Sequence, residues 1–496
     1  MDSKVFEPER SEVLRERDGD RLERFTAPRG DLPVVFVEGD PVTIGRQYGA
    51  LVGDRIRRNA DRLVGIFTGE GLPEVVVHLL IDKAWERLAP HVPGRFLAEM
   101  EAVSRGAREA GFDVSMIDLQ RITAVTNLDL YKREERLPEI IGPEGLEMLG
   151  DGAGEILSAL AGTQTMSCSM FAVWGTRTVD GKCFSMRNLD WISQSGIHAE
   201  RLITVCRPSG GNAFISAGYA GVIGCLSGMN EKGISLSEVG AFSVREELDG
   251  IPWTLMARQV LEESDTLDAA VAIIRKSRHT LGYNYLVADG DPERFGAPDF
   301  QPGAAAIETN FDCSEVFQDD DPKEQAAAWI DPEGKEHSYG VPIEEGVIRA
   351  DTAFGERTRA LQATDDGPGE PENTGNPRGR DDEGSSYTDC HLPIRDMILA
   401  YEKGGGYVFP VRGTRVIEAG PTRKIGAAEA LTIAATVAHG DEKLDENDWN
   451  VMSVVYAPTD LELWVAFESC DEAGRWRNAP GSGYWHLNLK ELLSDT

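Results

Sequence analysis

The chain has 496 residues, and its 84 acidic side chains outnumber the 50 basic ones to give a formal net charge of −34. Nucleic-acid binding needs clustered Lys and Arg, so this charge argues against a nucleic-acid partner. Because 41% of the residues are hydrophobic and only 27% are charged, the chain can bury a large core and is expected to be globular.

Two further features of the composition point to a cellular setting. The basic residues comprise 12 Lys and 38 Arg. Together with the acidic excess, this favours a halophilic protein, with a merely acidic mesophilic protein as the alternative. The stretch from Met1 to Arg29 lacks the apolar core of a signal peptide, and no apolar run reaches the ~18 residues that span a bilayer. We therefore expect a cytoplasmic protein with no membrane partner.

The seven cysteines are odd in number and show no CxxC spacing. This pattern predicts neither a disulfide framework nor a zinc site, and none of the eight histidines has metal-ligand spacing. No metal is expected.

The first third of the chain is predicted to be mainly helical. A short strand is expected at 33–40, and helical periodicity follows at 41–67, 73–110 and 115–132.

From Cys168 onward the apolar pattern changes to short runs separated by Gly, Pro and Asp turns. It predicts strands at 169–174, 183–186, 202–206, 213–217, 234–238, 283–288 and 304–308. Further elements are expected as a helix at 252–277, a helix at 427–438, a hairpin at 451–467 and a short helix at 487–493. Two acidic segments, 318–342 and 364–386, are predicted to be solvated insertions.

The strongest chemical signal lies between Ser167 and Trp191. Cys168 begins a strand, a turn at 179–182 reverses the chain, and the returning strand brings Arg187 and Asp190 back toward the cysteine. A guanidinium favours the thiolate, and a carboxylate can orient that guanidinium or accept from an amine. Such a cluster is more often structural than catalytic, and the spacing alone does not decide between the two.

The block Cys-Ser-x-Phe-Ala-x-Trp-Gly, then Asp-Gly, then Arg-Asn-Leu-Asp-Trp resembles the peptidase C45 group. These are the acyl-CoA:6-aminopenicillanic acid (isopenicillin N) acyltransferase-like proteins of the N-terminal-nucleophile (Ntn) hydrolases. Weaker similarities occur at 45–49, 228–234, 284–289, 306–308 and 452–458. The resemblance implies an α+β protein with the αββα sandwich of Ntn hydrolases. It also implies a mainly helical, pro-segment-like region at 1–167 before an Ntn core at 168–496.

The resemblance also implies a mechanism. Family members cut themselves before the residue that matches Cys168, and the new α-amine then serves as the base for the same thiol. Arg187 and Asp190 match the family's Arg and Asp, with implied roles in stabilising the thiolate and orienting the amine. An acyl group would pass from an amide or thioester to Cys168, and then to water or an amine. The two fragments are expected to stay associated.

The sequence departs from the family pattern at two places. Ser167 stands where the family usually has Gly. The oxyanion-stabilising Asn of a Thr-Asn-His-Phe-like motif is replaced in the best alignment by Thr352, which becomes the oxyanion candidate. A second register at 388–391 also lacks the Asn, and the dipeptide at 309–310 comes too early in the chain.

The expected substrate is a small-molecule amide or acyl thioester. No cofactor is implied, although acyl-CoA is a possible co-substrate. Two alternatives remain open at this stage: a dipeptidase or N-acyl-amino-acid amidohydrolase that uses the same nucleophile, and a catalytically silent scaffold that retains the fold.

Overall fold

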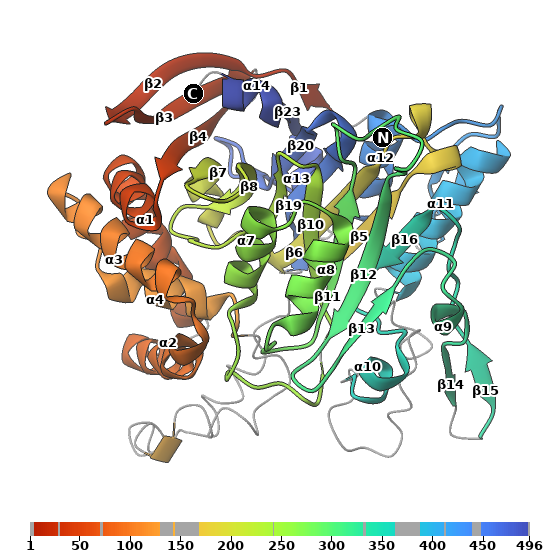
Figure 1. Ribbon diagram of the computed structural model, residues 1–496, viewed down its shortest axis with the longest axis horizontal. Helices are drawn as coiled ribbons and strands as arrows, with labels where there is room; N and C mark the ends of the chain where they lie inside the picture. Colours follow the sequence, from red (N-terminus) through yellow and green to blue (C-terminus); the bar gives the residue numbers. More distant parts are fainter. Residues whose placement is uncertain are drawn as a thin grey trace.

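The computed structural model of the chain (Figure 1) describes residues 4–27, 30–69, 73–128, 142–143, 168–241, 243–330, 334–362, 387–410, 413–438 and 448–494. These residues form two large sheets that lie face to face, since β10 of one sheet contacts β5 and β6 of the other.

The larger described sheet has ten strands. Their order across the sheet is β13 (Ser314–Phe317), β12 (Gly303–Thr309), β11 (Tyr283–Asp289), β10 (Ile234–Gly240), β9 (Ser227–Asn230), β8 (Phe214–Tyr219), β7 (Arg201–Pro208), β4 (Gly30–Gly39), β3 (Asp20–Ala27) and β2 (Glu9–Arg17). Neighbouring strands are antiparallel except at β4, which runs parallel to β7. This pairing joins the N-terminal strands to the sheet of the core.

The second described sheet has seven strands. Their order is β1 (Val5–Phe6), β23 (Tyr484–Asn488), β20 (Glu462–Phe467), β19 (Asp448–Ala457), β6 (Phe184–Ile192), β5 (Cys168–Val173) and β16 (Gly346–Arg349). Three small hairpins lie outside the two sheets: β14 (Ala328–Ile330) with β15 (Glu336–Ser338), β17 (Tyr407–Val408) with β18 (Arg415–Ile417), and β21 (Ser469–Cys470) with β22 (Trp476–Arg477).

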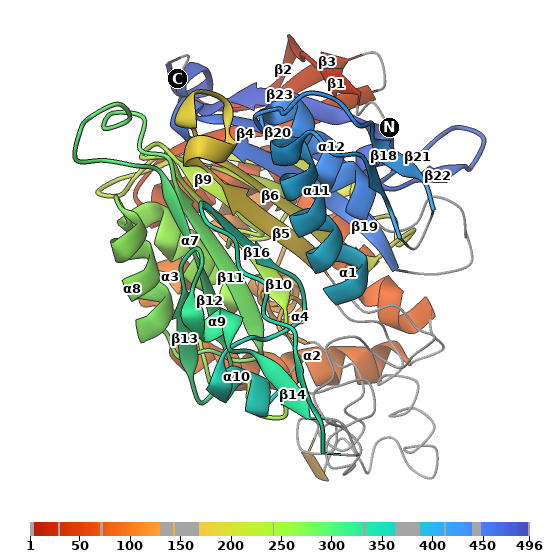
Figure 2. The ribbon, with the colours of Figure 1, turned by 90° about the vertical axis from the view of Figure 1, so that its right-hand side faces the viewer.

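Helices cover both outer faces of this pair of sheets (Figure 2). On the larger sheet these are α7 (Trp253–Glu263) and α8 (Leu267–Lys276), and on the smaller sheet α11 (Leu392–Lys403), α12 (Ala427–Val437) and α13 (Ala479–Ser482). Further short helices among the described residues are α9 (Pro322–Gln325), α10 (Glu356–Ala360) and α14 (Leu489–Ser494). The layers run helix, sheet, sheet, helix, so the predicted α+β fold with an αββα sandwich is confirmed.

A group of four helices lies beside the sandwich: α1 (Pro41–Gly69), α2 (Glu74–Leu88), α3 (Gly94–Glu109) and α4 (Met116–Val125). Helices α1 and α3 pack closely because glycines face the contact. A Cβ on Gly45 would lie 2.4 Å from the Glu99 carbonyl oxygen, and one on Gly49 would lie 2.0 Å from that of Val103. The two glycines of the segment 45–49, which resembles the family in sequence, therefore permit this helix contact. Among the described residues, no helix is long and apolar enough to cross a membrane.

The structure differs from the sequence prediction at several elements. The N-terminal stretch expected to hold one strand holds four, β1 to β4. Strand β2 reads ERSEVLRER and lacks an apolar alternation, so its conformation follows from pairing with β3. The helix expected at 252–277 is two helices, α7 and α8, separated at 264–266. The division at 167/168 into two regions stays a prediction.

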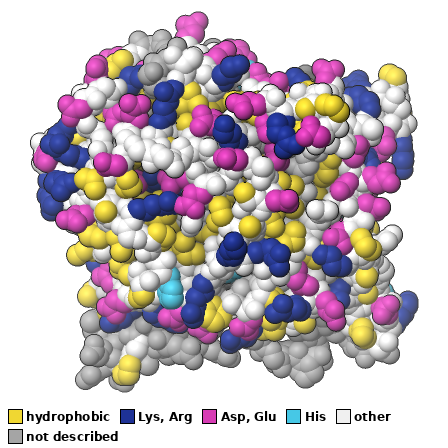
Figure 3. Space-filling model, viewed as in Figure 1, with side chains coloured by type: hydrophobic (Ala, Val, Ile, Leu, Met, Phe, Trp, Pro, Cys, Tyr) yellow, Lys and Arg dark blue, Asp and Glu magenta, His cyan; other side chains and the backbone are white. Residues whose placement is uncertain are grey.

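The acidic segment 318–342 is more structured than expected. It contains α9 and the β14–β15 hairpin, and Glu324 within it is buried at 4% exposure. The segment 364–386 lies outside the described residues. On the face shown in Figure 3, acidic and basic side chains are interspersed.

Candidate active site

Cys168 and Arg187 lie on adjacent strands, β5 and β6. The strands pair antiparallel with Cys168 opposite Leu189 and Met170 opposite Arg187. The connection turns at Asp180 and Gly181, whose φ values of 56° and 76° fall in the left-handed region. This geometry places Nη2 of Arg187 3.8 Å from Sγ of Cys168. The structure thus brings these two predicted site residues together.

The Arg187 guanidinium is fully buried and has further partners from the facing sheet. Its Nη2 lies 2.7 Å from Oε2 of Glu238 on β10, and its Nη1 donates to the Leu226 carbonyl and, at 3.2 Å, to Oγ of Ser227. Glu238 is also fully buried. The sequence analysis named Asp190 as the carboxylate beside this guanidinium and missed Glu238. A glutamate inside the apolar strand 234–240 was the available signal, because a buried carboxylate needs a cation or hydrogen bonds.

Burial has the largest effect on the pKa of the Cys168 thiol. It raises the pKa of the Cys168 thiol, and the nearby Arg187 charge lowers that pKa without cancelling the effect of burial. The carboxylates of Glu238, Asp190 and Asp351 raise the pKa further. The net shift of the pKa is upward, so these surroundings favour the thiol over the thiolate.

Asp190 lies near the thiol, since its charge is one of those that raise the pKa of Cys168. Its Oδ1 accepts a hydrogen bond from Nδ2 of Asn450, a fully buried residue opposite Asp190 in the pairing of β6 with β19. Asn450 was not foreseen, because it comes from a strand 260 residues away in the chain.

Asp351 contacts the main chain of Cys168. The Cys168 N–H donates to Oδ1 of Asp351 at 3.3 Å. Thr352, the oxyanion candidate, follows directly and is 6% exposed; its carbonyl oxygen accepts from Nδ2 of Asn284 at 3.1 Å. The sequence predicts Thr352 in this stretch as a site residue, and no motif in it singles out Asp351. Ser167 lies outside the described residues.

The other stretches weighed as oxyanion candidates have different places. Residues Tyr387–His391 form a π-helical turn next to the site, where burial and the charges of Asp190 and Asp351 raise the pKa of Cys390 well above its ordinary value. Asn310 caps a turn, since its Oδ1 accepts from the main-chain N–H groups of Asp312 and Cys313.

The seven cysteines all lie in the described residues, and none of them forms a disulfide. Within the part of the chain that the structure describes, no group of three or more His, Cys, Asp or Glu side chains could hold a metal ion.

Comparison with known proteins supports the assignment of this region. A family model described as acyl-coenzyme A:6-aminopenicillanic acid acyl-transferase matches residues 176–307. The resemblance seen in the sequence is confirmed. The matched stretch includes Arg187, Asp190 and Glu238 and begins shortly after Cys168.

One similar protein is an uncharacterized protein from Archaeoglobus fulgidus, 24% identical over 289 residues. The match covers 56% of this chain and 44% of the length of that relative.

Three solved structures of amide hydrolases are similar at low scores. The Caenorhabditis elegans N-acylethanolamine-hydrolyzing acid amidase ortholog is 11% identical with a TM-score of 0.35, covering 59% of this chain and 93% of its own. A mutant of the conjugated bile acid hydrolase from Clostridium perfringens is 12% identical with a TM-score of 0.34. The match covers 65% of this chain and 93% of the hydrolase. Penicillin V acylase from Agrobacterium tumefaciens is 13% identical with a TM-score of 0.31. The match covers 60% of this chain and 83% of the acylase. Scores this low carry no argument about the substrate of this chain.

Proposed function

We propose that the chain is a cysteine amidohydrolase or acyltransferase that activates itself by cutting the bond before Cys168. The observation that carries this proposal is the 3.8 Å contact between Sγ of Cys168 and the buried Arg187 guanidinium, at the first residue of an inner strand of an αββα sandwich. The family match over residues 176–307 supports it independently.

Self-cleavage supplies the base that the thiol lacks. Sγ of Cys168 attacks the carbonyl carbon of Ser167, the carbon–nitrogen bond breaks, and the nitrogen takes up the thiol proton; water then hydrolyses the resulting thioester. The freed α-amine titrates near pH 8 when unperturbed and lies within reach of its own thiol. One residue then provides both nucleophile and base.

Turnover follows from the same atoms. The neutral α-amine takes the proton of Sγ, the thiolate attacks the acyl carbon of the substrate, and an acyl-cysteine forms. Arg187 stabilises the thiolate, and Asp190 helps to orient the amine. Thr352 is proposed as an oxyanion donor because it directly follows Asp351, which contacts the Cys168 nitrogen.

The substrate class that fits is a linear amide or an acyl thioester, with acyl-CoA as a possible co-substrate and water or an amine as acceptor. A dipeptidase or an N-acyl-amino-acid amidohydrolase would use the same atoms.

A second candidate is a silent scaffold, and one observation favours it. Cys168 is 0% exposed, and the Arg187 charge that could activate its thiol is shared with Glu238. A thiol kept buried and neutral would be inert.

Intact-mass measurement separates the two candidates. The wild-type protein should appear as two fragments, residues 1–167 and 168–496, and Cys168→Ala should stay whole. Cys183→Ala, which replaces another fully buried cysteine, should split like wild type. The fragments should co-purify, because β4 of the first pairs with β7 of the second. A wild-type chain that stays whole and leaves Cys168 unreactive would favour the scaffold.

A further inference from the structure

The pairing of β16 with β5 brings Asp351 to the nucleophile. Arg349, the last residue of β16, is opposite Met170 in this antiparallel pair, and Asp351 follows two residues later in a bend. From this bend, Oδ1 of Asp351 lies 3.3 Å from the Cys168 nitrogen, so the contact is made directly after the end of the strand.

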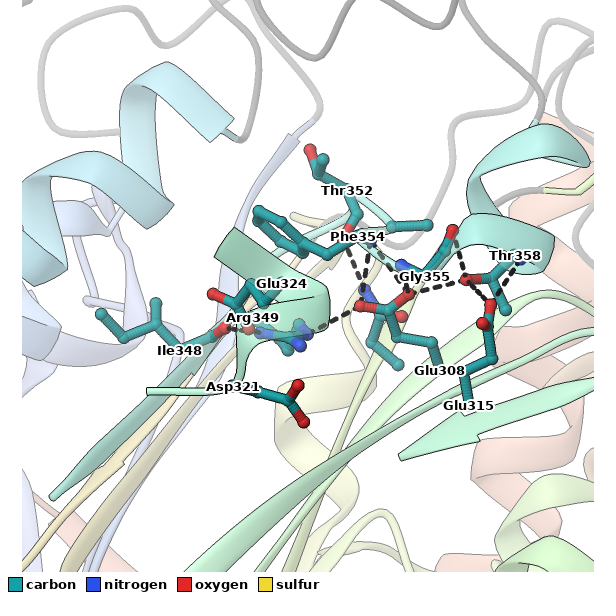
Figure 4. Close-up of polar contacts among 12 residues, drawn as sticks. Glu308, Glu315, Asp321, Glu324, Ile348, Arg349, Thr352, Phe354, Gly355 and Thr358 are labelled. Carbon is teal, nitrogen blue, oxygen red and sulfur yellow. Dashed lines mark hydrogen bonds and ion pairs between the residues drawn. The ribbon is translucent and has the colours of Figure 1, made fainter. Parts of the chain in front are cut away.

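The chain on the far side of Asp351 is anchored by a buried carboxylate (Figure 4). Glu308, at the end of β12, accepts from the N–H groups of Phe354 and Gly355, each at 2.9 Å, and from the Thr358 hydroxyl at 2.7 Å. Its other oxygen accepts from Nε of Arg349 at 3.0 Å. Residues on both sides of Asp351 are thus tied to one buried side chain.

Asn284 provides a second anchor for residues 350–352, which lie between the parts of the chain that Glu308 holds. Its Nδ2 donates to the carbonyl oxygens of Ala350, at 2.7 Å, and Thr352, at 3.1 Å. The main chain on either side of Asp351 is therefore held from β11, and the Asp351 carboxylate has a defined position relative to the nitrogen of Cys168. This degree of anchoring suits a group that must meet one particular atom.

We propose that Asp351 holds the α-ammonium group of Cys168 in the processed enzyme by a hydrogen bond and an ion pair. The proposal rests on the self-cleavage proposed above and adds a second carboxylate to the one, Asp190, that the sequence comparison implies. Asp351 only accepts: no proton passes to it, and the amine alone takes the proton of Sγ.

The consequence is a control on when the base is active. An opposite charge within a few Å of an amine favours its protonated form, and only the neutral form can take the thiol proton. The other charged groups facing this position are Arg187 and Asp190 on β6 and Glu238 on β10. Removing the Asp351 charge should lower the pKa of the amine and make the base available at lower pH.

The test is a titration that needs no substrate. Protein labelled with ¹⁵N-cysteine has one amine nitrogen after cleavage at Cys168, and NMR can follow its protonation against pH. The Asp351→Asn change keeps an oxygen acceptor and removes the charge, so the amine pKa should fall by about one unit. The pH at which iodoacetamide begins to alkylate Cys168 should fall with it. Asp299→Asn, the same change at a carboxylate with 81% side-chain exposure, should leave both unchanged.

The outcomes distinguish the proposed role of Asp351 from the proposed self-cleavage before Cys168, on which it rests. Wild-type protein that splits at Cys168, with an amine pKa equal in wild type and Asp351→Asn, overturns the role of Asp351 alone. A folded Asp351→Asn protein that stays whole also overturns the proposed role of Asp351. The Asn side chain can still accept a hydrogen bond from the Cys168 N–H, so such a result would mean that Asp351 has a role other than holding the released amine. Wild-type protein that does not split overturns both. If the Asn variant fails to fold by circular dichroism, Asp351→Ser removes the same charge with a smaller side chain and is titrated in its place.

Discussion

Two fully buried arginines, Arg187 and Arg349, lie in the same sandwich and do different things. Arg187 shares its charge between one carboxylate, Glu238, and the thiol of Cys168. Arg349 lies between two carboxylates, with Nε 3.0 Å from Glu308 and Nη1 2.7 Å from Glu324.

The two arginines differ in the groups that share the charge of the guanidinium. The Arg349 cluster has more acid than base, and burial raises the pKa of Glu324 despite the lowering effect of Arg349. At Arg187, burial lowers the pKa of the guanidinium, but the thiol and Glu238 raise it, and the net shift is upward. The effect of a buried cation on a neighbouring thiol therefore depends on the carboxylate that competes for it. Arg349 anchors the chain, whereas the Arg187 charge lowers the pKa of a neighbouring thiol.

The largest expected effect is on the Arg349 cluster. Arg349→Met leaves Glu308 and Glu324 buried without their cation, which should cost about 3–5 kcal/mol in the free energy of unfolding, measured by urea titration. Arg294→Met is the matched control, because Arg294 is 45% exposed and pairs with an exposed carboxylate, and it should cost less than about 1 kcal/mol. Equal losses in the free energy of unfolding would show that the buried cluster stabilises the fold no more than the exposed ion pair of Arg294 does.

Removal of the Arg187 charge should affect reactivity. Arg187→Ala should raise the pKa of Cys168 further and slow its alkylation by iodoacetamide at pH 7, by about tenfold for each unit of pKa. Arg187→Lys should fall in between, since an ammonium supplies charge without the planar fork. Alkylation is followed by the mass of the peptide that holds each cysteine, with Cys183 as internal reference because burial raises its pKa without a nearby arginine. If a folded Arg187→Ala protein keeps the wild-type ratio of the alkylation rates of Cys168 and Cys183, the contact between Arg187 and Cys168 is only structural.

Glu238→Gln should act in the opposite direction. The Glu238 carboxylate raises the pKa of Cys168, so its neutral isostere should lower that pKa and speed alkylation several-fold. Glu99→Gln is the control: Glu99 is also buried and paired with an arginine, Arg258, at 2.6 Å, but it lies on α3. Slower alkylation in Glu238→Gln would mean that Glu238 orients Arg187 more than it competes for its charge.

The smallest effect concerns salt and separates surface charge from buried charge. With a net charge of −34, self-repulsion should be screened as the Debye length falls from ~30 Å at 0.01 M salt to ~3 Å at 1 M, so the melting temperature should rise with KCl. The stability lost in Arg349→Met should stay the same across that range, because buried pairs are screened little. A flat or falling melting temperature between 0.1 and 2 M KCl would contradict the halophilic interpretation.

The sequence by itself determined the hairpin that carries Cys168 and Arg187 and much of the helical and strand pattern. The turn at 179–182 and the two apolar runs around it fix the register, and the register places Arg187 beside Cys168. The α1 helix was predicted because its apolar residues recur at helical spacing over 41–67, and α1 spans Pro41–Gly69. These features are local, so neighbouring residues contain the information.

Only the tertiary structure decided which groups complete the site. Glu238, Asn450 and Asp351 reach it from β10, from β19 and from the chain after β16. Asp351 is 183 residues from Cys168 in the chain, and its place next to Cys168 depends on the register in which the preceding strand β16 pairs with β5. Strands β2 and β3 were missed for the same reason, because β2 has a charged sequence and becomes a strand through its hydrogen bonds to β3. Long-range register is set by the packing of the whole sandwich, and no local pattern in the sequence records it.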